Sequence, residues 1–576
     1  MKILRVDMRN LSVKLEDLPF NWTAIGGRAL TARILRKEVH PAIDPLSAEA
    51  KIILACGPLA GTRAPSCGRL SIGAKSPLTL GIKETNAGGP IAQKLDRLGI
   101  RAIVIENTPT SDQLYILRIT NNGIEILPGQ EWAGLKNYSL AEGLFQRFGT
   151  TSSIISIGIA GERQWKSATI ALTDREGKSS RHAARGGLGA VMEAKGIKAI
   201  VIDDSDCDKL KIHDPKAFKQ TINNWAELTK KDIALTYLQK FGTPGMISTM
   251  QYLNCMPTNN YQQSSLQNIE QLTGEEINRI NRLRGGSMSA CMPGCLVSCS
   301  IKYRDKKRKF KTSNLQYQTI AMMGSNLGIT DPDVIAEFDY LCDNLGIDSI
   351  ELGSTLGVAA GLNLMKLGDP KSVRRLFEHI DYGTELGSLL ANGVEGFCRR
   401  MEIDRVPSYK GQAIPANDPR AIKTAGVSYA TSPMGADHTC DLSGHTHKIS
   451  KDHLSDSLAG QIQSAIIDAF GFCLLAVPTD NSAVLEYLKN LVNARYNLNL
   501  TETGLVDLGI DLLRDELEFN KTSGFYTQHM DDPSFIREES IGRQKKVFDI
   551  ESSKIKNFWS SLESKADNKH PETFSV

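Results

Sequence analysis

The sequence predicts an α+β chain in which a β-rich N-terminal domain is followed by two mainly helical domains. Short β-branched runs separated by glycine and proline recur over residues 1–205. From residue 206 the apolar residues recur at three- and four-residue steps, which is the spacing of amphipathic helices. A connector with proline and glycine, residues 406–417, divides the helical part. We therefore expect domains at 1–205, 206–405 and 406–576, as a length of 576 residues also suggests.

The expected strands are apolar runs at residues 53–54, 102–105, 115–117, 154–157 and 198–202. Glycine clusters lie between them, at residues 26–28, 57–62, 86–89 and 185–190. Glycine allows backbone N–H groups to approach an oxyanion, although any single cluster is more typical of a turn. The glycines alone therefore leave a phosphate-binding role open.

Helices are expected at residues 215–230, 274–284, 332–345, 350–365, 373–379, 385–400, 485–494 and 503–518. Residues 551–576 are polar, and we expect them to be frayed. No internal repeat is evident beyond one short motif that occurs twice.

Composition excludes several classes of function. Lys and Arg number 68 against 65 Asp and Glu, a net charge of +3, which argues against nucleic acid or an anionic membrane as a partner. The N-terminus is charged where a signal peptide needs an apolar run, and no stretch has the ~18 apolar residues of a membrane helix. We expect a cytoplasmic location, where clustered cysteines bind metal more often than they form disulfides.

Three of the 11 cysteines, Cys291, Cys295 and Cys299, fall within nine positions. Zinc, an iron–sulfur cluster, a disulfide and coincidence are the alternatives. A zinc site usually shows a C-x2-C pair with a second Cys or His pair, and a disulfide would leave one thiol over. The C-x3-C-x3-C spacing favours a cluster whose fourth ligand comes from a distant segment.

A short D-x-x-G motif occurs twice. One copy runs from Asp343 through Gly346 to Asp348, and the other from Asp468 through Gly471 to Cys473. Such a motif can also be an ordinary helix end, because glycine is common at that position. Two copies, one of which ends in cysteine, favour a functional role and offer Cys473 as the fourth cluster ligand.

The cysteine trio and the paired motif together resemble the tungsten-containing aldehyde:ferredoxin oxidoreductases. The resemblance extends along nearly the whole chain and includes GPLAGT at 57–62, SPLT at 76–79 and RGGLGAVM at 185–192. It implies tungsten, or molybdenum, held by two pterins, one at each D-x-x-G copy. It also implies a [4Fe–4S] cluster on Cys291, Cys295, Cys299 and Cys473, and allows a magnesium ion that bridges the pterin phosphates. Candidate contacts with the pterins or the cluster are Arg69, Asn86, Ala87, Arg181, Arg185, Asp343, Gly346, Asp348, Asp468 and Gly471.

The same resemblance places His438 in the active site, where it would move a proton to or from water or substrate. By itself, a histidine is more often a surface or core residue. His445, His447 and His453 lie nearby, so a small metal site is a further alternative. The family commonly has acids where this chain has Gln316 and Gln318. The segment at 337–340 lacks the Glu-x-x-His that some members use for an iron at a dimer interface, so that iron is not expected.

The resemblance implies an enzyme that interconverts an aldehyde and its carboxylic acid. Its electrons would pass to ferredoxin or to an iron–sulfur partner subunit, and the chain would be part of an oligomer. Two alternatives stay open. One is a family member that catalyses another low-potential reduction, because the pocket acids differ. The other is a non-enzymatic iron–sulfur electron carrier.

Overall fold

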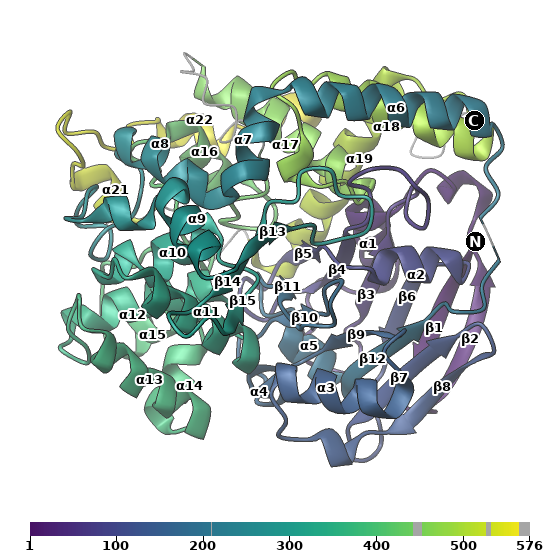
Figure 1. The fold of residues 1–576 in the computed structure, drawn as a ribbon, viewed down its shortest axis with the longest axis horizontal. Coiled ribbons are helices and arrows are strands. Elements are labelled where there is room, and N and C mark those ends of the chain that lie inside the picture. Colours follow the sequence, from purple (N-terminus) through teal and green to yellow (C-terminus); the bar gives the residue numbers. More distant parts are fainter. Residues whose placement is uncertain (209, 442–451, 526–531, 564–576) are drawn as a thin grey trace.

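The computed structural model describes residues 1–208, 210–441, 452–525 and 532–563. Figure 1 shows the strands at the lower right, helices α8 (Met246–Tyr252) to α15 (Val394–Arg400) at the left, and α17 (His453–Ala469) and α19 (Glu502–Ser523) at the top. The predicted fold class, a β-rich N-terminal part followed by mainly helical parts, is confirmed. The domain boundary at residues 406–417 stays a prediction. Among the described residues, no helix is long and apolar enough to span a bilayer.

The N-terminal part contains two six-stranded sheets. In spatial order the first contains β2 (Ser12–Asp17), β1 (Lys2–Asp7), β6 (Ile100–Glu106), β3 (Ile52–Cys56), β4 (Leu70–Lys75) and β5 (Ile82–Ala87). The second contains β8 (Gly123–Pro128), β7 (Tyr115–Thr120), β12 (Ile197–Asp203), β9 (Ser153–Ser156), β10 (Ile170–Leu172) and β11 (Arg181–Ala183).

The two sheets are copies of one topology. Each strand of the first has a counterpart six strands later in the second, and β1–β6 and β7–β12 are the parallel pairs within them. The expectation of no repeat beyond the D-x-x-G motif is therefore wrong. The copies keep strand order and apolar pattern, but sequence likeness is concentrated in stretches such as GIRAIVIE at 99–106 and GIKAIVID at 196–203.

Burial explains how the sheets are layered. β3 and β4 are fully buried, and side chains of both sheets meet in one shared apolar core. On the outer side of the first sheet, α1 (Gly27–Glu38) packs with α17 and α19 in a second core. The equivalent helix α3 (Asn137–Phe148) covers the second sheet. Short helices precede the last strand of each copy, α2 (Ile91–Arg97) in the first and α5 (Leu188–Ala194) in the second.

The remaining helices are α4 (Ile159–Glu162), α6 (Pro215–Lys231), α7 (Ile233–Phe241), α9 (Gly274–Leu283), α10 (Tyr317–Met323), α11 (Pro332–Leu345), α12 (Ser349–Gly361), α13 (Pro370–Tyr382), α14 (Glu385–Ala391), α16 (Lys423–Thr431), α18 (Ala483–Tyr496) and α21 (Ser534–Glu538). Small antiparallel sheets are formed by β13 (Ser287–Ser289), β14 (Ser300–Arg304) and β15 (Phe310–Thr312), and by β16 (Ser408–Tyr409) and β17 (Gln412–Ala413).

Local sequence signals explain the best-predicted helix, α11. The Asp331 side chain accepts a hydrogen bond from the Asp333 N–H at 2.9 Å, and Pro332 occupies the first turn. The helix ends at Gly346, whose φ of +77° favours glycine. Capping residues at both ends therefore fix the predicted boundaries, 332–345.

Two predictions are wrong. The helix expected at 385–400 is two helices, α14 and α15, because Gly393 between them has a φ of +91° and breaks the turn. Of the segment expected to be frayed, residues 551–563 are described and are more ordered than expected, since α22 (Ser552–Lys556) and α23 (Ser560–Glu563) form within them. Phe558 is only 7% exposed, and the Trp559 indole N–H donates to the Thr431 carbonyl at 2.9 Å. Burial of Phe558 and partial burial of Trp559 outweigh the polar composition around them.

Candidate functional site

Both D-x-x-G copies lie at the ends of helices, α11 and α17, and their glycines have φ values of +77° and +60°. Each loop is bonded to the N-terminal backbone. The Thr169 N–H donates to the Gly346 carbonyl at 2.8 Å, and the Arg69 N–H donates to the Gly471 carbonyl at 3.0 Å. Both motifs are therefore helix ends, as one interpretation of the sequence held. These helix ends also bind the N-terminal part of the chain to the helical part.

Two glycines of the N-terminal part allow this close approach. A Cβ on Gly158 would lie 2.3 Å from the Leu345 carbonyl oxygen, and one on Gly57 would lie 2.0 Å from that of Phe470. We call these two contacts the glycine seam. Backbone bonds continue along it: the Asp348 N–H donates to Ser167 at 3.0 Å, and the Cys473 N–H donates to Ser66 at 2.9 Å.

The seam brings both motif aspartates to one cavity. Predicted residues from four distant segments line it: Arg69, Asn86, Ala87, Arg181, Arg185, Cys291, Cys299, Gln318, Asp343, Asp348, His438, Asp468 and Cys473. Three other predicted residues, Gly346, Gly471 and Cys295, do not line it. The two glycines lie instead against the N-terminal backbone, so the close approach that they permit is to the protein chain.

Three arginines, Arg69, Arg181 and Arg185, bring positive charge to the lining of the cavity. Arg69 is held by Asn86, whose backbone carbonyl accepts from Nη2 at 2.8 Å, and Arg181 donates to the Ser313 carbonyl at 2.9 Å. Within the described residues, Nε of both Arg181 and Arg185 is buried without a hydrogen-bond acceptor. Orphaned guanidinium donors fit an anionic ligand such as the phosphate of a pterin cofactor.

Acidic groups face these arginines. Burial raises the pKa of Asp468, and burial together with Asp339 raises that of Asp343 well above its usual range. Glu84 also lines the cavity, and burial followed by the charge of Asp468 raises its pKa to about 8. Carboxyl groups of this kind can accept hydrogen bonds from the amino and ring N–H groups of a pterin, so the donor set fits that cofactor.

The four predicted cluster ligands influence one another's ionisation. A hydrogen bond with Cys295 and the charges of two arginines lower the pKa of Cys291, although burial opposes the shift. The same hydrogen bond raises the pKa of Cys295, while burial raises those of Cys299 and Cys473. Four soft sulfur donors beside positive charge fit an anionic iron–sulfur cluster.

Among the described residues, no three His, Cys, Asp or Glu side chains are arranged to hold a single metal ion. His445 and His447, invoked for a small metal site, lie outside the described residues.

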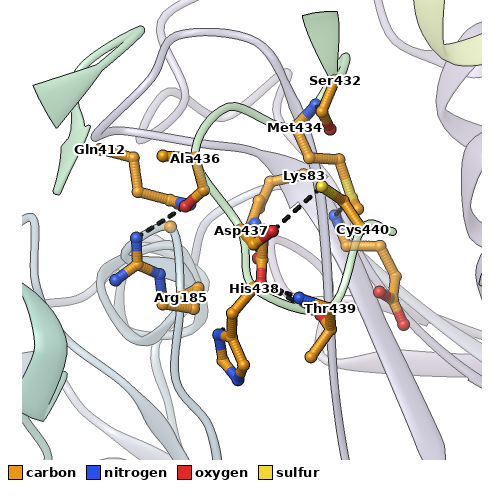
Figure 2. Close-up of polar contacts among 12 residues, drawn as sticks. Lys83, Arg185, Gln412, Ser432, Met434, Ala436, Asp437, His438, Thr439 and Cys440 are labelled. Atoms are coloured by element: carbon orange, nitrogen blue, oxygen red, sulfur yellow. Dashed lines mark hydrogen bonds and ion pairs between the residues drawn. The ribbon is translucent and has the colours of Figure 1, made fainter. Parts of the chain in front are cut away.

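His438 lies at the end of a buried ionic chain. Lys83 Nζ is 2.5 Å from Asp437 Oδ2, and Asp437 Oδ1 is 3.6 Å from His438 Nδ1. Burial acts to raise the pKa of Asp437, but the charges of Lys83, His438 and Arg185 hold it below its usual range. In Figure 2 the imidazole points away from Lys83, and Arg185 donates to the neighbouring Ala436 carbonyl at 2.8 Å. A charged Asp437 thus fixes the loop that carries His438.

Gln318 is held in one orientation. Its Oε1 accepts a hydrogen bond from the Ala416 N–H at 2.8 Å. Because a backbone N–H needs an acceptor, this bond assigns the oxygen, and the amide NH₂ is the group left to donate elsewhere. Gln316 lines the same cavity. The family that the sequence resembles commonly has acids at positions 316 and 318. At position 318 this chain instead has an amide that is a fixed hydrogen-bond donor.

Sequence reasoning missed several residues of the site. Lys83 and Glu84 precede Asn86 on β5 and were not singled out, and neither were Arg28, Tyr138 and His182 beside the motif aspartates. The position of Lys83 and Glu84 beside a predicted contact is the one available signal. The other three become recognisable only when the duplication of the sheets is known.

Comparisons with known proteins agree along the chain. Residues 3–204 match the family model for the aldehyde ferredoxin oxidoreductase N-terminal domain, and residues 220–558 match that for domains 2 and 3 of the same family. The tungsten-containing aldehyde ferredoxin oxidoreductase of Thermococcus kodakarensis is 30% identical over 562 residues, covering 91% of this chain and 89% of the relative.

Two further relatives have other printed activities. The aliphatic sulfonate oxidoreductase, WOR-like subunit, of Pyrococcus furiosus is 26% identical over 559 residues, with 89% of this chain and 84% of the relative covered. The solved active-site complex BamBC of benzoyl coenzyme A reductase has a TM-score of 0.79 at 16% identity, and 97% and 94% of the two chains are covered. The last likeness concerns the fold alone.

Proposed function

Because the chain belongs to the aldehyde ferredoxin oxidoreductase family, we propose that it oxidises an aldehyde with water to a carboxylic acid, or runs the reverse reaction. The observation that carries the proposal is the single cavity that gathers both D-x-x-G aspartates, three arginines, three of the four cysteines and His438. When bound, a bis-pterin tungsten or molybdenum centre supplies the two-electron chemistry, and a [4Fe–4S] cluster carries the electrons onward.

Each group of residues has a role in this proposal. Arg69, Arg181 and Arg185 bind pterin phosphates through their guanidinium donors, with or without a bridging magnesium ion. Asp343 and Asp468 each orient one pterin. The cluster is held by the cysteine trio and Cys473. In this proposal the electrons pass to ferredoxin or to an iron–sulfur partner subunit, and the chain is part of an oligomer. A relative named as a WOR-like subunit supports the partner subunit.

His438 is the proposed proton carrier. It lines the cavity, and Asp437 and Lys83 fix its loop from the opposite side. Histidine is the side chain whose ordinary pKa, about 6.5 for a free imidazole, lies closest to neutral pH, so this residue type suits proton transfer there. We expect His438→Asn to lower turnover by about 10²–10⁴-fold with cofactor content unchanged. The matched control is His379→Asn, which alters an exposed histidine outside the cavity. Equal turnover in the two variants would remove His438 from the mechanism.

Gln318 favours a second candidate, a family member that performs another low-potential reduction. A fixed amide cannot accept a proton from water at neutral pH, whereas it can hold an oxyanion. Gln318→Glu is a conservative test, since a carboxylate can still accept from the Ala416 N–H. If the native chain oxidises no aldehyde and Gln318→Glu creates that activity, the natural reaction is this second candidate.

Elemental analysis of anaerobically purified protein tests the cofactor assignment directly. The proposal requires tungsten or molybdenum together with about four irons per chain. Iron without tungsten or molybdenum, in protein whose host supplies both metals, would instead identify a non-enzymatic electron carrier.

A further inference from the structure

The two copies in the N-terminal part can be matched residue by residue through their strand pairings. Gly99 and Gly196 open the matching stretches that contain β6 and β12. In the first copy, Ala102 on β6 pairs with Ala55, Ala55 with Ser71, and Ser71 with Asn86 on β5. In the second copy, Ala199 on β12 pairs with Ser156, Ser156 with Ala171, and Ala171 with His182 on β11. His182 therefore occupies the position of Asn86, a predicted cofactor contact.

The same matching applies to the two helices that begin each copy. Gly27 is the first residue of α1 and Asn137 the first of α3. A Cβ on Gly27 would lie 2.1 Å from the Asp468 carbonyl oxygen, and Asn137 donates to the Asp343 carbonyl at 2.8 Å. Each helix start thus holds the backbone of one motif aspartate. Arg28 and Tyr138, the next residues, are equivalent.

Side-chain contacts preserve this equivalence. Around Asp468, Asn86 Nδ2 lies 3.1 Å from Oδ1 and Arg28 Nη1 lies 3.4 Å from Oδ2. Around Asp343, His182 Nε2 lies 3.3 Å from Oδ1 and the Tyr138 hydroxyl lies 3.4 Å from Oδ2. Each aspartate therefore has one partner on a strand and one on a helix, and corresponding partners approach corresponding oxygens.

The chemistry of the two sets differs. Arg28 is a fixed cation beside Asp468, whereas Tyr138 is neutral beside Asp343. Asn86 cannot take up a proton, but an imidazole can. Burial lowers the pKa of His182 to about 4, and burial followed by Asp339 raises that of Asp343, so the His182–Asp343 pair holds its proton on the carboxyl group. The other titratable side chains around this pair are Tyr138, Asp174, Arg181, Asp339 and Tyr340.

We propose that Tyr138 and His182 complete a second cofactor half-site around Asp343, and that the His182–Asp343 pair exchanges a proton in step with cofactor reduction. This inference rests on the proposed function. With the cofactor bound, a donor to Asp343 would favour the deprotonated pair in the oxidised state. The negative charge added on reduction would favour the protonated pair, so Asp343 would bind one proton from solvent. Reoxidation would release that proton to solvent.

The test counts protons taken up when cofactor-loaded protein is reduced in weakly buffered solution. Electrochemically reduced methyl viologen serves as the donor because it carries no protons, and a pH indicator reports the uptake at pH 7–8. We expect His182→Asn, which copies the Asn86 half-site, to take up one proton fewer per metal than the native chain. The proton binds to Asp343, and an Asn amide N–H would donate to that group and favour its deprotonated carboxylate, whereas an imidazole nitrogen can accept from the protonated carboxyl group. Pterin, metal and iron contents should match those of the native chain. His379→Asn is the control.

Several results would overturn the inference. Equal proton uptake by the native chain and His182→Asn would contradict it. So would a native chain that takes up no proton on reduction, and this measurement needs no variant. Tyr138→Phe tests the half-site separately and should lower pterin content relative to Tyr340→Phe, and equal contents would contradict it. A native chain without tungsten or molybdenum would refute the proposed function itself, and elemental analysis recognises that outcome first.

Discussion

Gly158→Ala tests whether the glycine seam holds the site together. The backbone of Gly158, with φ −81° and ψ −167°, is accessible to alanine, so the substitution adds a methyl group without backbone strain. That methyl carbon would lie 2.3 Å from the Leu345 carbonyl oxygen, where ordinary contact begins at 3.4 Å. The end of α11 must therefore move away by about 1 Å, and it carries Asp343 with it.

The magnitude follows from what this movement disturbs. Overpacking of a tight contact costs about 1–3 kcal/mol. The hydrogen bonds from Thr169 to Gly346 at 2.8 Å and from Asp348 to Ser167 at 3.0 Å lie beside the clash. Each contributes about 0.5–1.5 kcal/mol, so their loss brings the total to about 2–6 kcal/mol.

The assay compares thermal unfolding and pterin content with those of Gly396→Ala. Gly396 lies inside α15 with nothing within 4 Å of an added Cβ, so its replacement by alanine should be neutral or stabilising. We expect Gly158→Ala to melt at a lower temperature than this control and to retain less pterin. Identical melting and identical pterin content in the two variants would refute the reasoning.

Three further predictions concern the cluster, the pterins and the stability of the chain. Cys473→Ala should lower iron content or change the EPR spectrum of the reduced cluster, whereas Cys398→Ala, outside the cavity, should do neither. Asp343→Asn and Asp468→Asn should each reduce pterin content, because a lost charge-assisted bond costs about 1.5–3 kcal/mol. If both variants keep the pterin content of the native chain, the two motifs are ordinary helix ends. Burial lowers the pKa of Lys195 from 10.5 to about 8, so between these values the unfolded chain binds the additional proton and stability rises with pH. Lys195→Met should flatten that rise in urea unfolding midpoints, and an unchanged slope would contradict the assignment.

Much of the architecture could be predicted from local patterns. The change from β-branched runs to helical periodicity, the capped ends of α11 and the close spacing of the cysteine trio are all encoded within a few residues of one another. The motif at 468–473 could be joined to that trio because its last residue is a cysteine. Shared lining of one cavity agrees with that link.

The rest depends on contacts between distant segments. Local sequence does not show that Gly158 meets Leu345, because that contact joins a loop to the end of a distant helix. Nor does it show that Asn86 and His182 are equivalent, because that relation follows from strand pairing. The buried chain from Lys83 to His438 likewise joins β5 to a loop some 350 residues later. The polar composition of residues 551–563 also masked the packing of Phe558, which is buried, and of Trp559, which is partly buried.

The glycine seam also sets an order of events during synthesis. The bond from the Arg69 N–H to the Gly471 carbonyl joins residues about 400 positions apart. At about 5–20 residues per second, a ribosome needs roughly 20–80 s to make the chain between them. The sheets therefore emerge, and can fold, well before the helices that close over them exist. During that interval the residues of the N-terminal part that line the cavity, Arg69, Arg181 and Arg185 among them, are not yet covered by the segment that ends in the second D-x-x-G motif.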